Sequence, residues 1–325
     1  MLKRERFFIV SQLPVFYGNR VTPRVPWTPT DVTQILLAWI LAVLIGNIAY
    51  GLLVPPHLEG KHRVFDGNQS IEVTFLPGNR YETEGDSGKY HFAGQQPQQN
   101  RNTIIFKPKN GSEITVQFAG TTRDRVGIIA VNLVFVQGSV VILIMLLLFK
   151  YRLKWKDAFG GLRNPAQTIA LPCLLGSLFL FPAFLLHSVS HFIIIKMGGD
   201  PSTQQAVQMV SAAENHAEIA LQAFSVVFMA PVAEELLFRG VIYSSIKQIG
   251  YQRAAIAVSA ILFAAVHTSW ALMLPLIVLA CILVWLYEKT GSLIAPMVMH
   301  ATFNAINFTL IKLSPQLVQQ CPRLN

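Results

Sequence analysis

Charged residues are scarce in this chain, and their scarcity decides its class. Only 13% of the 325 residues are Asp, Glu, Lys or Arg, whereas 52% are hydrophobic. Soluble domains carry about 25% charged residues. Several apolar runs approach the roughly 20 residues that a helix needs to cross a bilayer. The composition therefore excludes an ordinary soluble domain and predicts a polytopic membrane protein.

Cysteine is also rare, and familiar metal and repeat patterns are missing. The three cysteines, Cys173, Cys281 and Cys321, lie far apart, which excludes a disulfide framework or a CxxC metal site. The chain has no HExxH motif and no evident internal repeat. No basic stripe with interleaved aromatic residues accompanies the net charge of +9, so we expect no nucleic-acid partner. The expected surroundings are the lipid bilayer.

Alternation of apolar and polar stretches predicts an all-α helix bundle of about seven transmembrane helices with a small β-rich insert. The last four predicted spans cover about residues 219–246, 254–267, 272–287 and 294–313. The predicted segments are an N-terminal segment (1–31), a transmembrane helix (32–54), the extramembrane insert (55–125), a second transmembrane helix (126–149), a basic connector (150–166), a helical core (167–313) and a tail (314–325).

Local signals support two of these segments. The stretch "TPTD" predicts a helix start, with Thr28 as the N-cap, Pro29 in the first helical position and Asp31 in the third. In the insert, short alternating runs such as "SIEVTF" and "EITVQF" lie between turn signals. That pattern is typical of strands and hairpins.

Basic residues near the span ends predict the orientation. Residues 1–31 contain five Lys or Arg, and residues 150–163 contain five more. Short loops rich in Lys and Arg stay in the cytoplasm. We therefore expect a cytoplasmic N-terminus, an extracytoplasmic insert and residence in the plasma (inner) membrane of a bacterium.

The stretch "PVAEELLFRG" places three charges after an apolar helical run. Each of Glu234, Glu235 and Arg239 would cost about 2.5–3.5 kcal/mol near the bilayer centre. Glu235 and Arg239 are four residues apart and share a helix face, so they are predicted to pair. Glu234 is rotated by about 100° from Glu235 and is left to face the bundle interior.

Two histidines on later helices are predicted to reach the depth of Glu234. Glu234 lies 13 residues from Lys247, His267 lies 14 from Arg253, and His300 lies 11 from Lys289. At about 1.5 Å per residue, these positions are about 20, 21 and 17 Å from basic residues at one membrane surface. Three helices thus bring a carboxylate and two imidazoles to nearly one level.

The motifs "EELLFR", "FAAVH" and "HATFN" resemble, in this order, the EExxxR, FxxxH and HxxxN motifs of the CPBP family. This family contains CAAX-processing endoproteases and bacteriocin-immunity proteins. The resemblance implies that residues 167–313 form an intramembrane protease core with a site open toward the cytoplasm. It implies an endopeptidase that cleaves a membrane-embedded or lipidated substrate.

The resemblance also implies the role of each motif residue. Glu234 and His267 would activate water, His300 and Asn304 would stabilise the oxyanion, and Glu235 and Arg239 would support the site. Glu234, His267 and His300 would also supply a His₂Glu zinc site with an open fourth position. We expect catalysis without a required metal, with zinc as the alternative.

Two other functions remain open at this stage. A catalytically idle family member would keep the fold as a membrane scaffold or immunity-type protein, although all six motif residues are present here. A proton-coupled transporter would use the Glu and His residues as a relay. Transporters often have repeated halves, and no such pairing is evident in this sequence.

The predicted topology can be checked at Ser87. A cysteine at this position should react with a membrane-impermeant thiol reagent added outside intact cells, because the insert is expected outside the cytoplasm. Labelling only after the membrane is opened would show that the orientation is reversed.

Overall fold

The computed structural model describes residues 25–53, 60–66, 69–76, 79–92, 103–106, 114–117, 125–162, 164–198, 210, 213 and 216–313. Most of the predicted N-terminal segment and the whole predicted tail lie outside the described residues. The chain divides into two compact units, one of residues 1–44 with 132–325 and one of residues 45–131.

Helices dominate the described residues, as the composition predicted. In chain order they are α1 (Pro29–Leu53), α2 (Arg125–Val131), α3 (Ser139–Lys150), α4 (Trp155–Phe159), α5 (Leu171–Leu178), α6 (Leu180–Lys196), α8 (His216–Ala223), α9 (Ala230–Glu235), α10 (Ser244–Gln248), α11 (Gln252–Ala265), α12 (Trp270–Thr290) and α13 (Ile294–Leu313). Four π-helical stretches continue them, namely η1 (Asn132–Gly138), η2 (Ala166–Ala170), η3 (Phe224–Met229) and η4 (Leu236–Tyr243).

Six helical segments of the described chain are long and apolar enough to cross a membrane. They are Pro29–Leu52, Val126–Lys150, Ala166–Lys196, His216–Gln248, Trp270–Thr290 and Ile294–Leu313. The span expected over residues 254–267 is instead α11, a helix of 14 residues. At about 1.5 Å per residue α11 is about 21 Å long, short of the roughly 30 Å hydrocarbon core. A polytopic helical bundle is confirmed, with six candidate spans and one shorter helix.

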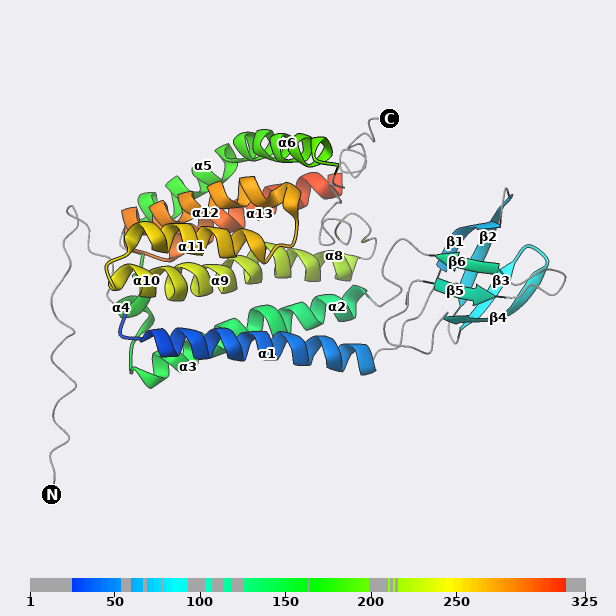
Figure 1. Cartoon of the computed structure of the whole chain (residues 1–325), viewed down its shortest axis with the longest axis horizontal. Helices are drawn as coiled ribbons and strands as arrows, with labels where there is room; N and C mark the ends of the chain where they lie inside the picture. Colours follow the sequence, from blue (N-terminus) through cyan, green and yellow to red (C-terminus); the bar gives the residue numbers. More distant parts are fainter. Residues whose placement is uncertain are drawn as a thin grey trace, which may run out of the picture. The chain divides into compact units, whose positions relative to one another are not determined.

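The helical segment His216–Gln248 lies in the middle of the bundle (Figure 1). It comprises α8, η3, α9, η4 and α10 in sequence. Helix α3 packs against it on one side, and α11 and α13 pack on the other. This central position explains why every residue of η4 is buried.

Helix α1 begins as the sequence predicted and is tied to the end of α3. The backbone N–H and the hydroxyl of Thr28 donate to Oδ2 of Asp31, at 2.7 and 2.8 Å. Lys150 Nζ lies 2.5 Å from Oδ1 of Asp31, and the hydroxyl of Tyr151 donates to Oδ2 at 2.6 Å. Burial, and next the hydrogen bond to Asp31, raise the pKa of Tyr151 to about 12. The hydroxyl therefore remains a donor over the physiological range.

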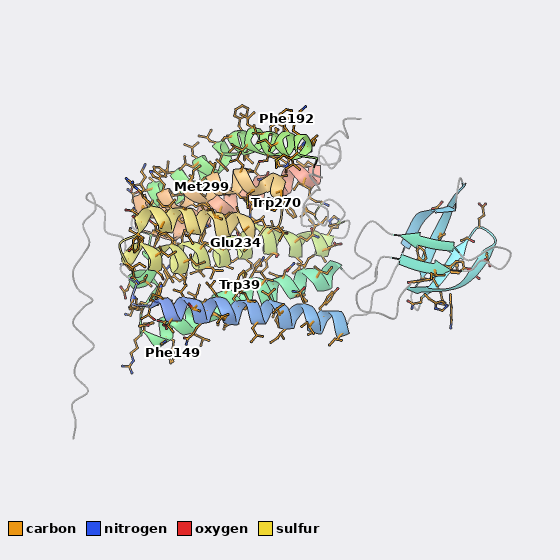
Figure 2. The ribbon with its side chains drawn as sticks, in the orientation of Figure 1. Trp39, Phe149, Phe192, Glu234, Trp270 and Met299 are labelled. Carbon is orange, nitrogen blue, oxygen red and sulfur yellow. The ribbon has the colours of Figure 1, made fainter. Side chains whose placement is uncertain are left out.

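Helices α5 and α13 approach closely enough for their backbones to touch. A Cβ atom on Gly176 would lie 2.7 Å from the carbonyl oxygen of Met299 and 3.1 Å from Cβ of Thr302. Phe179 at the end of α5 packs on Phe303, with ring centroids 5.6 Å apart. Figure 2 labels Met299, which directly precedes His300. The contact at Gly176 therefore sets the position of α13 next to a predicted site residue.

The unit of residues 45–131 contains the β structure predicted for the insert. Its strands are β1 (Gly60–Asp66), β2 (Gln69–Leu76), β3 (Arg80–Thr83), β4 (Asp86–Phe92), β5 (Thr103–Phe106) and β6 (Ile114–Gln117). Each strand pairs antiparallel with the next along the chain. Val73 and Phe75 alternate with more exposed neighbours and are buried. Phe75 meets Tyr90 edge-on at 5.1 Å, which forms a small core of this sheet.

Replacement of Asp31 tests the link between α1 and α3. The Asp31→Asn variant removes a carboxylate whose side chain is only 5% exposed and which accepts from Lys150, Tyr151 and Thr28. We expect the free energy of unfolding to fall by about 1–3 kcal/mol, measured by thermal unfolding in detergent. Lys150→Gln is the control, because the Lys150 side chain is 58% exposed and should contribute less. Equal losses in both variants would contradict this account.

Candidate active site

The predicted charged motif spans the end of α9 and the start of η4. In the π-helical segment η4, two backbone carbonyl groups accept hydrogen bonds from the hydroxyl groups of serine side chains. Ser244 Oγ donates to the carbonyl of Arg239 at 2.8 Å, and Ser259 Oγ on α11 donates to the carbonyl of Phe238 at 3.2 Å. The second bond fastens α11 to the motif helix. Such π-helical insertions are frequent at functional sites.

Glu235 and Arg239 form the ion pair that their spacing predicted. Oε1 of Glu235 lies 2.8 Å from Nη1 of Arg239, and both side chains are 0% exposed. Nη2 of Arg239 donates to the carbonyl of Ala280 at 3.3 Å, and its guanidinium lies 4.6 Å from the ring centroid of Phe263. The pair thus joins three helices, α9–η4, α11 and α12. Each charge is compensated where water cannot reach it.

His300 lies between the two neighbouring glutamates. Its Nδ1 is 3.0 Å from Oε1 of Glu235, and its Nε2 is 3.8 Å from Oε2 of Glu234. An ionised carboxylate only accepts hydrogen bonds, so Nδ1 of His300 carries a hydrogen. In the neutral ring, Nε2 then presents a lone pair toward Glu234. The ring is held rigidly, since the His300 side chain is 4% exposed.

His267 reaches the same carboxylate from the end of α11. Its Nδ1 lies 2.7 Å from the carbonyl oxygen of Phe263, which can only accept, so Nδ1 is protonated. Its Nε2 lies 4.0 Å from Oε2 of Glu234. The ring of Phe263 lies 5.0 Å from the His267 ring and 5.7 Å from the His300 ring. Phe263 and His267 therefore share one face of the helix end, as residues four apart in a helix do.

Glu234 lies inside the helical bundle (Figure 2). The Nε2 atoms of His267 and His300 both lie within 4.0 Å of its Oε2 atom. Its Oε2 atom is buried without a hydrogen-bond partner among the described residues. Two acceptors that share one bridging water lie about 4.4 Å apart. The 4.0 Å separation from His267 is close to this value. The side chain of Glu234 is 26% exposed, which leaves room for a reactant.

The sixth motif residue, Asn304, has a different partner. Its Nδ2 donates to the carbonyl of Val226 in η3 at 2.9 Å. The structure therefore brings five predicted site residues together around two carboxylates, while Asn304 joins α13 to the central helix beside them. This bond uses one of the two N–H groups of the amide.

The geometry of the cluster also bears on the zinc alternative. Among the described residues, no group of three or more His, Cys, Asp or Glu side chains is placed to hold a metal ion. Two ligands of a tetrahedral zinc lie about 3.3 Å apart. The nitrogens of His300 and His267 lie 3.8 and 4.0 Å from Glu234. The side chains as placed do not fit zinc, and the mechanism below does not pass through one.

Two contributors to the site were not predicted from the sequence. Ser259 lies four residues before Phe263 and eight before His267, so helical periodicity could have placed it on the same face. Gly176 offered no such signal, because its role depends on the backbone of a distant helix. Both position site residues without touching Glu234 in any recorded contact.

Removal of either partner of the buried ion pair should destabilise the protein. Glu235→Gln or Arg239→Leu leaves the other charge buried and unpaired, at a cost of about 3–5 kcal/mol. Thermal unfolding in detergent should show both variants to be clearly less stable than Asn304→Ala. Equal stability of the three variants would show that the ion pair does not form.

The region around the site is similar to known proteins. The Rce1-like model, described as type II CAAX prenyl endopeptidase Rce1-like, matches residues 216–306, which include all six motif residues. The UPF0177 protein YxdF of Lactococcus lactis subsp. lactis (strain IL1403) is 37% identical over 97 residues. The aligned region covers 29% of this chain and 52% of that relative, so the chain spans about half of its length. No solved structure gives a significant match. Over residues 216–306, the chain is thus similar to the Rce1-like family of type II CAAX prenyl endopeptidases.

Proposed function

We propose that this protein is an intramembrane endopeptidase that hydrolyses a peptide bond in a membrane-associated or lipidated substrate. The observation that carries the proposal is the carboxylate of Glu234, which lies 3.8 and 4.0 Å from the Nε2 atoms of two histidines inside a membrane-spanning bundle. Ionisable side chains inside a membrane-spanning bundle are energetically costly, and where they occur they usually mark a functional site. The matched Rce1-like model names the same class of reaction.

Water activation is assigned to Glu234 and His267. A water that donates to Oε2 of Glu234 and to Nε2 of His267 is oriented with its lone pair toward the substrate. Glu234 accepts a proton as the water oxygen attacks the carbonyl carbon of the scissile bond. The hydrogen bond from Nδ1 of His267 to Phe263 keeps the ring in the tautomer that this step requires.

Oxyanion stabilisation is assigned to His300, with Asn304 as the second donor. Glu234 and Glu235 carry two negative charges and Arg239 carries one positive charge, so a proton on His300 balances the cluster. Protonated His300 donates from Nδ1 to Glu235 and presents its Nε2–H to the developing oxyanion. Donors fixed in advance around such a charge contribute strongly to catalysis.

Collapse of the tetrahedral intermediate completes the reaction. The carbon–nitrogen bond breaks as Glu234 returns its proton to the leaving amine, and the products are a carboxylic acid and an amine. Glu235 and Arg239 do not exchange protons in this scheme. They hold His300 in place through the 3.0 Å contact between Glu235 and Nδ1.

The proposed membrane is a bacterial plasma membrane with the ends of α3, α10 and α12 in the cytoplasm. Lys150, Lys247 and Lys289 lie near these three ends. The segment after α3 adds Arg152, Lys154 and Lys156, all of which are exposed. This concentration of basic residues supports the orientation.

Variants of the two water-activating residues test the proposed function. Glu234→Gln and His267→Ala should each lower the rate of peptide cleavage by about 10²–10⁴-fold, because they remove the base or the second acceptor. Purified protein in lipid bilayers is assayed with transmembrane and lipidated peptides by mass spectrometry. His191→Ala is the matched control, since His191 lies on α6 beside His187 and outside the Glu234 cluster.

The three variants should retain the thermal stability of the natural chain to within a few degrees. Cleavage by Glu234→Gln at the natural rate would overturn the assignment of the base. A stable natural protein that cleaves none of the peptides would favour a non-proteolytic member of the family.

A further inference from the structure

We infer that residues 151–156, which we call the basic segment, bind the phosphate groups of anionic phospholipids at the membrane surface. The segment follows α3 and includes the first two residues of α4, at the end of the bundle that also holds α10 (Figure 1). The inference goes beyond the proposed function, because it assigns a lipid-binding site outside the Glu234 cluster. It does not depend on peptide cleavage.

Side chains of the basic segment alternate between the core and the surface. Every second residue is apolar, partly buried and packed against the hydrophobic core, namely Tyr151, Leu153 and Trp155. The residues that follow each of these are basic and exposed, namely Arg152, Lys154 and Lys156. This alternation directs three cations away from the core within five residues of chain.

The end of α3 places an arginine where glycine is favoured. The N–H of Arg152 donates to the carbonyl of Phe149 at 3.1 Å, and the N–H of Leu153 donates to that of Leu148 at 2.9 Å. This pair of bonds is the Schellman motif, whose left-handed position is usually a glycine. Arg152 occupies that position with φ of 53°, and its side chain forms no hydrogen bond or ion pair with another described residue. Backbone strain without a structural contact indicates a role in binding.

Helix α4 fixes the other end of the basic segment. The Phe159 ring is 0% exposed, and its centroid lies 5.0 Å from that of Trp155 and 5.8 Å from that of Trp27. The carbonyl of Phe159 accepts a hydrogen bond of 2.8 Å from the N–H of Leu293, just before α13. Because both ends are fixed, the three cations are held near one another before a ligand binds. Binding therefore costs little additional order in the backbone.

The surface of α3 that leads to the basic segment is apolar. Ile142, Leu146 and Phe149 are 61%, 57% and 83% exposed on this candidate membrane span. From Lys150 to Lys156, every exposed side chain is basic. So sharp a change on a membrane-spanning helix marks the boundary between the hydrocarbon core and the lipid headgroups. The lipid phosphates therefore lie beside the basic segment.

The local charge selects an anionic lipid. Lys150 pairs with Asp31 at 2.5 Å, so this lysine is already compensated. The three cations of the segment and the exposed carboxylate of Asp157 together leave two positive charges. Clusters of basic residues next to a membrane-spanning helix attract anionic lipids. A nucleic acid or an acidic protein would also meet this charge, but only a lipid offers phosphate continuous with acyl chains for the apolar surface of α3.

Thermal unfolding in detergent with added short-chain lipids tests the site. Dioctanoyl phosphatidylglycerol is the anionic probe, and dioctanoyl phosphatidylcholine is the control of the same chain length without net charge. A ligand that binds only the folded protein raises its melting temperature. Phosphatidylglycerol should raise the melting temperature of the natural chain more than phosphatidylcholine does. This difference should shrink as salt is added, because salt screens exposed charges.

The Arg152→Gly variant separates lipid binding from stability. Glycine suits the left-handed backbone, so without lipid this variant should unfold at the same temperature as the natural chain or at a higher one. Its affinity for phosphatidylglycerol, obtained by titration of the shift, should fall about fivefold. The double variant Lys154→Gln/Lys156→Gln should lose more. Lys89→Gln is the matched control, because it removes one exposed positive charge from a strand of the other unit and should respond as the natural chain does.

The inference is overturned if the two lipids give equal shifts, or if Arg152→Gly and the double variant respond to phosphatidylglycerol as the natural chain does. It is also overturned if Lys89→Gln loses the response to the same extent, or if Arg152→Gly is less stable without lipid. An equal shift with inorganic phosphate at the same concentration would show a site for free phosphate in place of lipid. No step of this experiment measures cleavage, so failure of the proposed function would be seen separately.

Discussion

The buried ion pair between Glu235 and Arg239 is the interaction on which the rest of the site depends. Neither charge is stable alone in an apolar bundle, so the pair must form for the central helix to remain there. Because Arg239 also contacts the carbonyl of Ala280 and the ring of Phe263, the pair fixes α11 and α12 against η4. Glu235 also contacts His300, and this second contact holds α13 in place beside the ion pair.

The hydrogen bond made by Nδ1 gives the neutral rings of both site histidines the same tautomer, with the hydrogen on Nδ1. His267 donates to a backbone carbonyl and His300 to a carboxylate, so each neutral ring turns a lone pair toward Glu234. The Glu234 carboxylate and the two Nε2 lone pairs are three hydrogen-bond acceptors that face one another. They repel one another unless a hydrogen-bond donor or a positive charge lies between them. Water and a proton on His300 meet this requirement in the proposed reaction. The arrangement of these three acceptors therefore favours the binding of a hydrogen-bond donor, such as water, between them.

The short helix α11 limits how much of the central helix its neighbours can cover. A helix of 14 residues is about 21 Å long and cannot cover its neighbours over the whole hydrocarbon core. It ends near the residues of the site, since His267 follows directly after its last turn and lies 4.0 Å from Glu234. The length of α11 therefore brings a helix end, with its histidine, to the carboxylate in the interior of the bundle.

The sequence by itself determined the membrane class, the helix start at Thr28, the strands of the insert and the pairing of Glu235 with Arg239. Each of these follows from composition or from residues close together in the chain, where helix and strand periodicity decides which side chains meet. Its count of residues from basic anchors also predicted that Glu234, His267 and His300 share a level. Only the tertiary structure decided that His300 bridges both glutamates, that Asn304 bonds to Val226 and that α5 touches α13 at Gly176. These contacts join helices distant in sequence, and their geometry depends on crossing angles and backbone approach, which local periodicity does not specify.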